Sequence, residues 1–558
     1  MKQSDEIWWR HGIFYQIYPR SFQDTNADGV GDLVGIINRL PYLLELGVDA
    51  IWLSPIFPSP MADFGYDIAD YIGVDPLFGT MEDFDALAQA AHAAGLKLIL
   101  DLVPNHTSDQ HPWFIESRSS RNNPKRDWYI WRDPRAGGGP PNNWLAEFGG
   151  CAWEYDAATG QYYYHAFLAE QPDLNWRNPE VRQAIYDVMR FWLRKGVDGF
   201  RVDVIWHLIK DQQFRDNPPD PDYAIGEKPK RALIPLYTAN LPEVHDVIAE
   251  MRRVVDEFPD RLLIGEIYLP IDQLVAYYGR DLTGVHLPFN FALLNAPWQA
   301  RTIANLIEEY ERLLPPGGWP NWVLGNHDRP RIASRVGAAQ ARIAAMLLLT
   351  LRGTPTIYYG DEIGMEQVAI PDEAARDPVA HNLPGLGLGR DGCRTPMQWD
   401  AGRFAGFSAV EPWLPLETVY QQRNVAALRA DDKSIYQLHR RLIALRRQHP
   451  ALQVGSYRPR AAEGDLLVFV RETDSECILV ALNLGAQPAA VKLPSDNREG
   501  RLLLSSLCDR ADERVARAID LRGNEGVIIE LSGQQTRPTV QQTTASSRGT
   551  TGKCARSP

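Results

Sequence analysis

The chain has 558 residues, which is too long for a single hydrophobic core and predicts about two to four domains. Hydrophobic residues make up 44% of it and charged residues 23%, which excludes disordered, collagenous and coiled-coil chains. The net charge of −13 is a poor match for a phosphate backbone, so we expect no nucleic acid partner.

The compartment is predicted from the N-terminus, the apolar runs and the cysteines. Residues 1–6 lack the apolar region of a signal peptide, and no apolar run reaches the 18 residues of a membrane span. The five cysteines are scattered and form no CxxC pair, as in a protein with reduced thiols. We expect a cytoplasmic protein that has no membrane partner and is a monomer or a homodimer.

Eight short apolar segments have the character of buried strands, and amphipathic helical stretches lie between most of them. The helical periodicity is clear over 33–46, 81–94 and 338–351. Eight strand-then-helix units predict an α/β fold, a closed parallel (β/α)8 TIM barrel with an outer ring of helices. The predicted strands are 12–18, 50–53, 96–101, 199–203, 262–266, 285–288, 322–325 and 355–359.

Two long spacings interrupt this rhythm. About ninety residues separate the third and fourth strands, far more than a loop needs, so we expect a small inserted domain after strand 3. A Pro/Gly/Asp-rich excursion over 361–430 follows strand 8, and a helix at 434–448 closes the barrel. The predicted domains are the barrel at 1–104 and 176–452, the inserted domain at 105–175, a C-terminal antiparallel β-sandwich at 453–531 and a disordered tail at 532–558.

The closing helix carries two arginine pairs, Arg440–Arg441 and Arg446–Arg447. Charge runs of this kind usually lie on a solvated helix face. We therefore expect all four side chains to face solvent and not to form a nucleic-acid patch.

Three acids stand at or just after the ends of predicted strands: Asp203, Glu266 and Asp328. The C-terminal ends of barrel strands converge on one mouth, so these side chains are expected to meet there. Arg201 lies two residues before Asp203 and leaves the strand on the same face. We expect this pairing to lower the pKa of Asp203 and keep it ionised.

Paired carboxylates without clustered metal-binding His or Cys residues indicate glycoside hydrolysis. In that reaction one carboxylate attacks the anomeric carbon and another protonates the leaving oxygen. Glutamate has the higher intrinsic pKa and the longer reach, so Glu266 is the expected acid. Asp203, paired with Arg201, is then the expected nucleophile.

Four motifs around these acids resemble those of the α-amylase family, glycoside hydrolase family 13, in its α-glucosidase and oligo-1,6-glucosidase branch. The insert-domain segment Gln171-Pro-Asp-Leu-Asn and the strand-eight segment Gly360-Asp361-Glu362 extend the similarity. In order, the four motifs are Asp101-Leu-Val-Pro-Asn105-His106, Gly199-Phe-Arg201-Val-Asp203, Ile264-Gly265-Glu266 and Asn326-His327-Asp328.

The resemblance implies roles for these and further residues. Asp203 is the implied nucleophile, Glu266 the acid/base and Asp328 the stabiliser of the transition state. Phe148 and Phe167 match aromatic pocket walls, although packing inside the inserted domain would explain them equally well. The implied contacts to the terminal sugar are Asp63, Tyr66, His106, Phe148, Phe167, Arg201, His327 and Arg394.

The function implied is that of a retaining, exo-acting α-glucosidase that removes terminal α-linked glucose from short oligosaccharides and also transfers it to sugar acceptors. Val204 follows the nucleophile, and in this branch a valine there accompanies α-1,6 preference, so α-1,4 and α-1,6 linkages both stay open. One alternative is a trehalose synthase or another glucosyl-transfer isomerase of the same family. A second alternative is a non-catalytic relative that acts as a partner subunit.

A separate loop carries oxygen ligands at alternate positions with a glycine at the sixth, as at the start of an EF-hand calcium loop. The twelfth position is Gly35, so the usual bidentate glutamate is absent. Similar family members hold Ca²⁺ or Mg²⁺ here, which predicts a structural ion; a metal-free aspartate turn is the alternative. The predicted ligands are Asp24, Asn26, Asp28, Asp32 and the backbone carbonyl of Val30.

Overall fold

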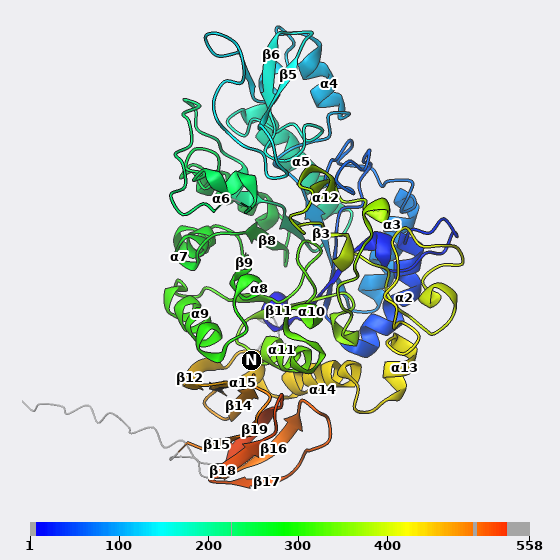
Figure 1. Cartoon of the computed structure of the whole chain (residues 1–558), viewed down its shortest axis with the longest axis vertical. Coiled ribbons are helices and arrows are strands. Elements are labelled where there is room, and N and C mark those ends of the chain that lie inside the picture. The colour runs from blue at the N-terminus through cyan, green and yellow to red at the C-terminus, as the bar shows by residue number, and fades with distance from the viewer. Residues whose placement is uncertain (1–6, 225, 495–498, 533–558) are drawn as a thin grey trace, which may run out of the picture.

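The computed structural model describes residues 7–224, 226–494 and 499–532. A closed barrel of parallel strands forms its centre, with the inserted domain at one end of the molecule and an antiparallel sheet at the other (Figure 1). This confirms the predicted fold class. The predicted tail, apart from its first residue, lies outside the described residues.

All eight predicted barrel strands are present. Both faces of these strands are buried, which is why they read as continuous apolar runs in the sequence. The sixth begins two residues later than predicted, because the amide of Val285 is still bonded to Tyr277 of the preceding turn. Around the barrel the strands are β1 (Phe14–Ile17), β2 (Ala50–Leu53), β3 (Lys97–Leu102), β7 (Gly199–Val202), β8 (Leu262–Ile267), β9 (Leu287–Asn290), β10 (Asn321–Val323) and β11 (Thr354–Tyr358).

Helices surround the barrel, and their ends are set by local signals. Asp32 caps one helix through the amide of Gly35, and Thr80 and Asp83 form a capping box at the next. The helices from the N-terminus to the last barrel strand, outside the inserted domain, are α1 (Trp8–His11), α2 (Leu33–Leu46), α3 (Met81–Ala93), α5 (Pro179–Arg194), α6 (Val244–Asp256), α7 (Ile271–Leu274), α8 (Ala292–Asn295), α9 (Ala300–Leu313), α10 (Ile332–Val336) and α11 (Ala338–Thr350).

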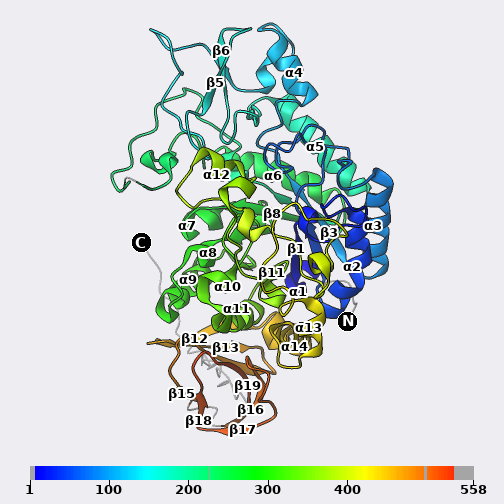
Figure 2. The same ribbon diagram turned by 45° about the vertical axis from the view of Figure 1, so that its right-hand side comes forward.

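The inserted domain stands over the C-terminal ends of the barrel strands (Figure 2). It contains α4 (Pro112–Ser119) and a small antiparallel sheet of β4 (Trp131–Arg132), β6 (Gln161–Tyr164) and β5 (Trp153–Asp156). Aromatic side chains hold it together; Trp144 packs at 5.8 Å from Trp153 and at 5.2 Å from Tyr164, between ring centroids.

The C-terminal domain is an antiparallel sheet whose two ends share one buried core. Its eight strands are hydrogen-bonded into one antiparallel sheet, not two separate ones, because β16 pairs with both β19 and β17 and so carries the sheet onward. In sheet order they are β12 (Ser456–Glu463), β13 (Leu466–Glu472), β14 (Cys477–Asn483), β19 (Gly526–Ser532), β16 (Glu499–Ser505), β17 (Arg514–Ala516), β18 (Ala518–Leu521) and β15 (Ala489–Lys492).

After the barrel, the excursion carries α12 (Pro378–Asn382) and α13 (Val425–Ala430), and α14 (Ile435–Gln448) and α15 (Pro450–Gln453) lead to the sheet. The solvated-face prediction for α14 is wrong at Arg446, which is fully buried. Its guanidinium donates to the carbonyl oxygens of Leu349 and Leu351 at 3.0 Å and of Gly353 at 2.5 Å. These carbonyls end α11 and lead into β11, so Arg446 fixes α14 to the barrel.

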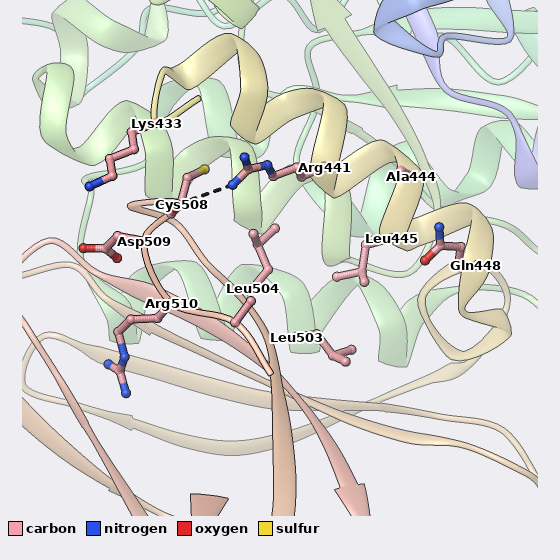
Figure 3. A pocket seen from close by; sticks show the side chains of 11 residues that line it. Lys433, Arg441, Ala444, Leu445, Gln448, Leu503, Leu504, Cys508, Asp509 and Arg510 are labelled. Carbon is pink, nitrogen blue, oxygen red and sulfur yellow. Dashed lines mark hydrogen bonds between the residues drawn. The ribbon is translucent and has the colours of Figure 1, made fainter. Parts of the chain in front are cut away.

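A cleft of 590 Å³ lies where α14 meets the sheet. Figure 3 shows Arg441 and Leu445 of α14 facing Leu503, Leu504 and Cys508 across it. None of the predicted site residues lines this cleft. Among the described residues, no helix combines the length and the apolar character that crossing a bilayer requires.

The buried arginine gives a test of the barrel closure. Arg446→Met keeps a long side chain but leaves three buried carbonyl oxygens without their donor. Each unsatisfied group costs about 1–3 kcal/mol, so we expect the free energy of unfolding to fall by about 3 kcal/mol or more in urea denaturation followed by circular dichroism. Arg441→Met, on an exposed part of the same helix, is the matched control and should change it by less than about 0.5 kcal/mol. Equal losses in both variants would contradict this role.

Candidate active site

The three predicted acids meet at the mouth of the barrel. Asp203 directly follows β7, Glu266 is the next-to-last residue of β8, and Asp328 lies in the loop after β10. The Asp203 and Glu266 side chains are only 9% and 4% exposed, whereas that of Asp328 is 23% exposed. This largely buried cluster, called the chamber below, is more exposed on the side of Asp328.

A single buried guanidinium organises the inner half of the chamber. Nη1 of Arg201 lies 2.8 Å from Oδ1 of Asp101 and 2.7 Å from Oδ1 of Asp203. Nη2 of the same residue lies 2.8 Å from Oε1 of Glu266. One positive charge thus faces three carboxylates, and the predicted pairing of Arg201 with Asp203 is present. Asp101 was quoted in the sequence motif but was not predicted as a site residue.

Burial and the excess of carboxylates over guanidinium groups affect the pKa values of these acids. Burial and the charge of Glu266 raise the pKa of Asp203 well above its ordinary value, and Arg201 does not compensate. Arg201 does lower this pKa, as expected, but burial and the charge of Glu266 outweigh it, so the expectation that the pKa of Asp203 lies below its ordinary value is wrong. Burial also raises the pKa of Glu266, and that of Asp101 to about 6. Asp203 and Glu266 lie on the same guanidinium and the pKa of each is raised, so this pair holds a proton more readily than ordinary carboxyl groups do.

Asp328 is in the opposite electrostatic state. Its Oδ1 accepts from Arg394 at 3.0 Å and from Arg390 at 3.2 Å, and its Oδ2 lies 3.4 Å from Nε2 of His327. Burial acts to raise the pKa of Asp328, but His327, Arg390 and Arg394 together bring it far below its ordinary value. Asp328 is therefore a permanent anion beside a pair of acids that holds a proton.

Arg390 is a site residue that the sequence reasoning missed. Besides Asp328, it contacts Oδ1 of Asp63 at 2.7 Å and Oδ1 of Asp377 at 2.7 Å. Its guanidinium lies 4.9 Å from the centroid of the Phe148 ring. Arg390 lies four residues before Arg394 in the same segment. This spacing is the feature of the sequence that could have indicated a second cation near Asp328.

A layer of hydrogen-bonded rings lies beside the acids. The Tyr66 hydroxyl donates to Oδ2 of Asp101 at 3.0 Å and lies 2.7 Å from Nε2 of His327, and the two rings stack at 5.3 Å. Gln16 Nε2 approaches Nδ1 of His327 at 2.9 Å. Burial lowers the pKa of His327 to about 3, so this ring is neutral. With Gln16 donating to Nδ1, the proton of His327 sits on Nε2 and points toward Tyr66 and Asp328.

The inserted domain supplies one wall of the chamber. Phe167 lies 5.1 Å from His106 and 5.5 Å from Phe148, measured between ring centroids. Gln171, which was quoted only as part of a motif, places its amide nitrogen 3.1 Å from Nε2 of His106 and 3.3 Å from Oδ2 of Asp63. Phe148 also belongs to a small hydrophobic cluster with Val379 and Leu383 of the excursion and Leu168 of the inserted domain. The two insertions thus pack together over the acids.

The predicted metal loop lies apart from the acids. Asp24 accepts from the amides of Ala27 at 2.8 Å and Gly29 at 2.9 Å, and Asp32 accepts from Thr25 and caps α2. Oxygen donors are those that calcium prefers. The side chains of Asp24 and Asp32 accept hydrogen bonds from within the loop, and the structural ion stays a prediction. Among the described residues, one group of three His, Cys, Asp or Glu side chains has its ligand atoms within 4.8 Å of one another: His449, Glu476 and Glu530.

Two acids of the strand-eight motif do not reach the chamber. Glu362 accepts from the hydroxyls of Tyr15 at 2.7 Å and Tyr42 at 2.5 Å, inside the ring of helices. Asp361 lies 3.8 Å from Nη1 of Arg331. Burial raises the pKa of Asp361 to about 7, more than Arg331 lowers it. Both acids are structural.

Comparison with known proteins gives matches over most of the chain. A model of the alpha-amylase catalytic domain matches residues 16–455. The chain is 42% identical over 526 residues to "Probable alpha-glucosidase" of Rhizobium meliloti (strain 1021), covering 91% of this chain and 95% of that protein. It is 41% identical over 542 residues to oligo-1,6-glucosidase of Heyndrickxia coagulans, covering 90% and 96%.

Solved structures give matches of similar extent. The structure of the alpha-glucosyl transfer enzyme XgtA superposes with a TM-score of 0.90 at 41% identity, covering 95% of this chain and all of that one. The trehalulose synthase MutB of Pseudomonas mesoacidophila MX-45 superposes with a TM-score of 0.87 at 36% identity, covering 94% and 99%.

The buried acid Asp361 predicts a pH dependence of stability. The unfolded carboxyl has a pKa near 4 and the folded one about 7, so between these values the folded state binds more protons. The contribution of Asp361 to stability is therefore expected to fall as pH rises from about 4 to 7, and Asp361→Asn should remove this contribution, up to about one bound proton, from the slope of stability against pH. The melting temperature measured across this range tests it. An unchanged slope in Asp361→Asn would contradict the raised pKa.

Proposed function

Because the chain belongs to the α-amylase family and is a glycoside hydrolase, we propose that it is a retaining, exo-acting α-glucosidase with additional transglucosylation activity. The observation that carries the proposal is the pair of buried acids on one guanidinium. The raised pKa values of Asp203 and Glu266 favour one proton on this pair, while the lowered pKa of Asp328 favours its anion. Two carboxyl groups with one proton are what the first half of a double displacement requires.

In the first step, the carboxylate of Asp203 attacks the anomeric carbon and forms an ester bond. The glycosidic C–O bond breaks, and the proton of Glu266 passes to the departing oxygen. In the second step, Glu266 takes a proton from water, whose oxygen attacks the same carbon and releases the sugar from Asp203. A sugar hydroxyl in place of water gives transglucosylation. The permanent charge of Asp328 stabilises the positive charge that develops on the ring in both steps.

Exo action is supported by the closed end of the chamber. Arg390 joins Asp63, Asp328 and Asp377 there, and Phe148 covers its guanidinium. A chain that continued beyond the terminal unit would have to displace these ion pairs. We therefore propose that a single glucose unit enters, with its 4- and 6-hydroxyl end toward Arg390 and Asp63.

The rival activities differ from this one in product. Two of the compared proteins are named for glucosyl transfer and for trehalulose synthesis, so isomerisation or transfer as the main reaction is the second candidate. A non-catalytic role is disfavoured because all three acids and their arginine partners are in place. The linkage preference, with Val204 beside the nucleophile, is open between α-1,4 and α-1,6.

A substrate panel decides among these activities. With maltotetraose, the initial products are expected to be glucose and maltotriose, with the released glucose in the α configuration by NMR. Maltose as the initial product would contradict exo action, and β-glucose would contradict retention. Maltose and isomaltose, compared at equal concentration, define the linkage preference. Trehalose as the main product from maltose would establish the isomerase instead.

The division of labour between the acids predicts how Glu266→Gln behaves. A disaccharide needs protonation of its leaving oxygen, so its turnover should fall by about 10²–10⁴-fold. An aryl glucoside with an acidic phenol leaves unaided and should form the glucosyl-enzyme at a much less affected rate.

Azide supplies the matched control for this variant, because it needs no general base. It should restore turnover of the aryl glucoside and give α-glucosyl azide. A β-configured azide would exclude the double displacement, and equal losses on both substrates without rescue would exclude Glu266 as the acid/base.

A further inference from the structure

Val204, the residue after the proposed nucleophile, has a backbone conformation that its side chain disfavours. Its φ of 35° and ψ of 44° lie in the left-handed region. A β-branched residue adopts this region only when the surrounding structure imposes it, and such outliers concentrate at functional sites. Val204 is also nearly buried, with 8% of its surface exposed. The turn is therefore held in place by contacts on both sides of it.

The left-handed turn aims one backbone N–H at the proposed acid/base. The amide of Val204 donates to Oε2 of Glu266 at 2.8 Å, and its carbonyl accepts from the amide of His207 at 2.8 Å. The amide of Asp203 is still bonded to Leu102 of the neighbouring strand. The hydrogen bonds between β7 and β3 thus end at Asp203, and the N–H of Val204 points toward β8 instead.

A glycine lets the turn come this close. A Cβ built on Gly265 would lie 3.2 Å from Cγ2 of Ile205 and 3.2 Å from Cγ1 of Val285. Both distances are tighter than ordinary packing allows, so a side chain at this position would press Ile205 away from β8. Gly265 directly precedes Glu266, and Ile205 directly follows Val204. The hydrogen bond from Val204 to Glu266 and the close approach of Ile205 to Gly265 therefore lie at the same contact between the end of β7 and β8.

We propose that Val204 is a positioning residue for the acid/base: its strained turn, seated on Gly265, holds the Glu266 carboxyl by a backbone hydrogen bond. This rests on the proposed function. With Oε1 beside Arg201 and Oε2 on the amide of Val204, both oxygens of the carboxyl are fixed. A donor to a carboxylate favours the ionised form, so the amide opposes the rise in pKa that burial causes. Glu266 is thereby kept able to act first as acid and then as base.

The test separates the backbone turn from the side chain. Gly265→Ala adds the Cβ that would press Ile205 away from β8 and so displaces the turn. Val204→Gly is the matched control, because it removes the side chain but keeps the N–H at a conformation that glycine adopts without strain. The readout is the alkaline limb of kcat/KM against pH on maltose, which reports loss of the proton from the acid. A weakened hydrogen bond should move this limb upward.

For Gly265→Ala we expect the limb to rise by about half a unit to one unit and kcat on maltose to fall about tenfold. An activated aryl glucoside should lose less, because its leaving group needs no acid. Val204→Gly should leave the limb within about 0.2 units of wild type, because the N–H stays in place. The melting temperature of each variant establishes that it is folded.

An unshifted limb in a folded Gly265→Ala, or the same shift in Val204→Gly, would overturn the inference. The first result would mean that the N–H does not act on Glu266, and the second that the side chain does. Failure of the proposed function is distinct from both, because wild type would then show no α-glucosidase activity on maltose, isomaltose or aryl glucosides.

Discussion

The protonation of the acids in the site depends on the number of arginine side chains that each group of acids contacts. Arg201 alone serves Asp101, Asp203 and Glu266, so that cluster holds a proton. Asp328, only a loop away, receives both Arg390 and Arg394 and is ionised throughout. A glycosidase of the proposed kind needs both states at once, a proton to give and a fixed anion to stabilise positive charge. The two protonation states arise within one buried chamber because the ratio of guanidinium to carboxyl groups differs between its two sides.

The register of the barrel strands determines which acids lie beside Arg201. Asp101 and Arg201 are direct partners across β3 and β7, and Arg201 is the partner of Ile264 on β8. Alternation along the strands then brings Asp203 and Glu266 to the same face as Arg201. The outer cation has a different origin. Arg390 comes from the excursion after β11 and is oriented by Asp377, so the outer wall forms only when the excursion and the inserted domain pack together.

Features that depend on the local sequence pattern can be predicted from the sequence. Features that depend on contacts with residues far away in the chain cannot. Eight apolar runs identify the eight strands, and their positions place Asp203, Glu266 and Asp328 at one mouth. The pKa of Asp203 is raised, against expectation, because burial and the charge of Glu266 outweigh the effect of Arg201. Arg446 lies on a charged helix and is nevertheless buried, since its partners are carbonyls some ninety residues away. The left-handed turn at Val204 carries no sequence signal, because valine is not a residue that favours it.

The central claim is that Asp203 forms a covalent bond to the sugar. The direct measurement is mass spectrometry of the protein after incubation with 5-fluoro-α-D-glucosyl fluoride, whose ring fluorine slows release of the glucosyl-enzyme. The account predicts one fluoroglucosyl group per chain, carried on the peptide that contains Asp203, with loss of activity in proportion to labelling. A label on a different carboxylate, or steady turnover of this reagent without any labelled protein, would contradict it.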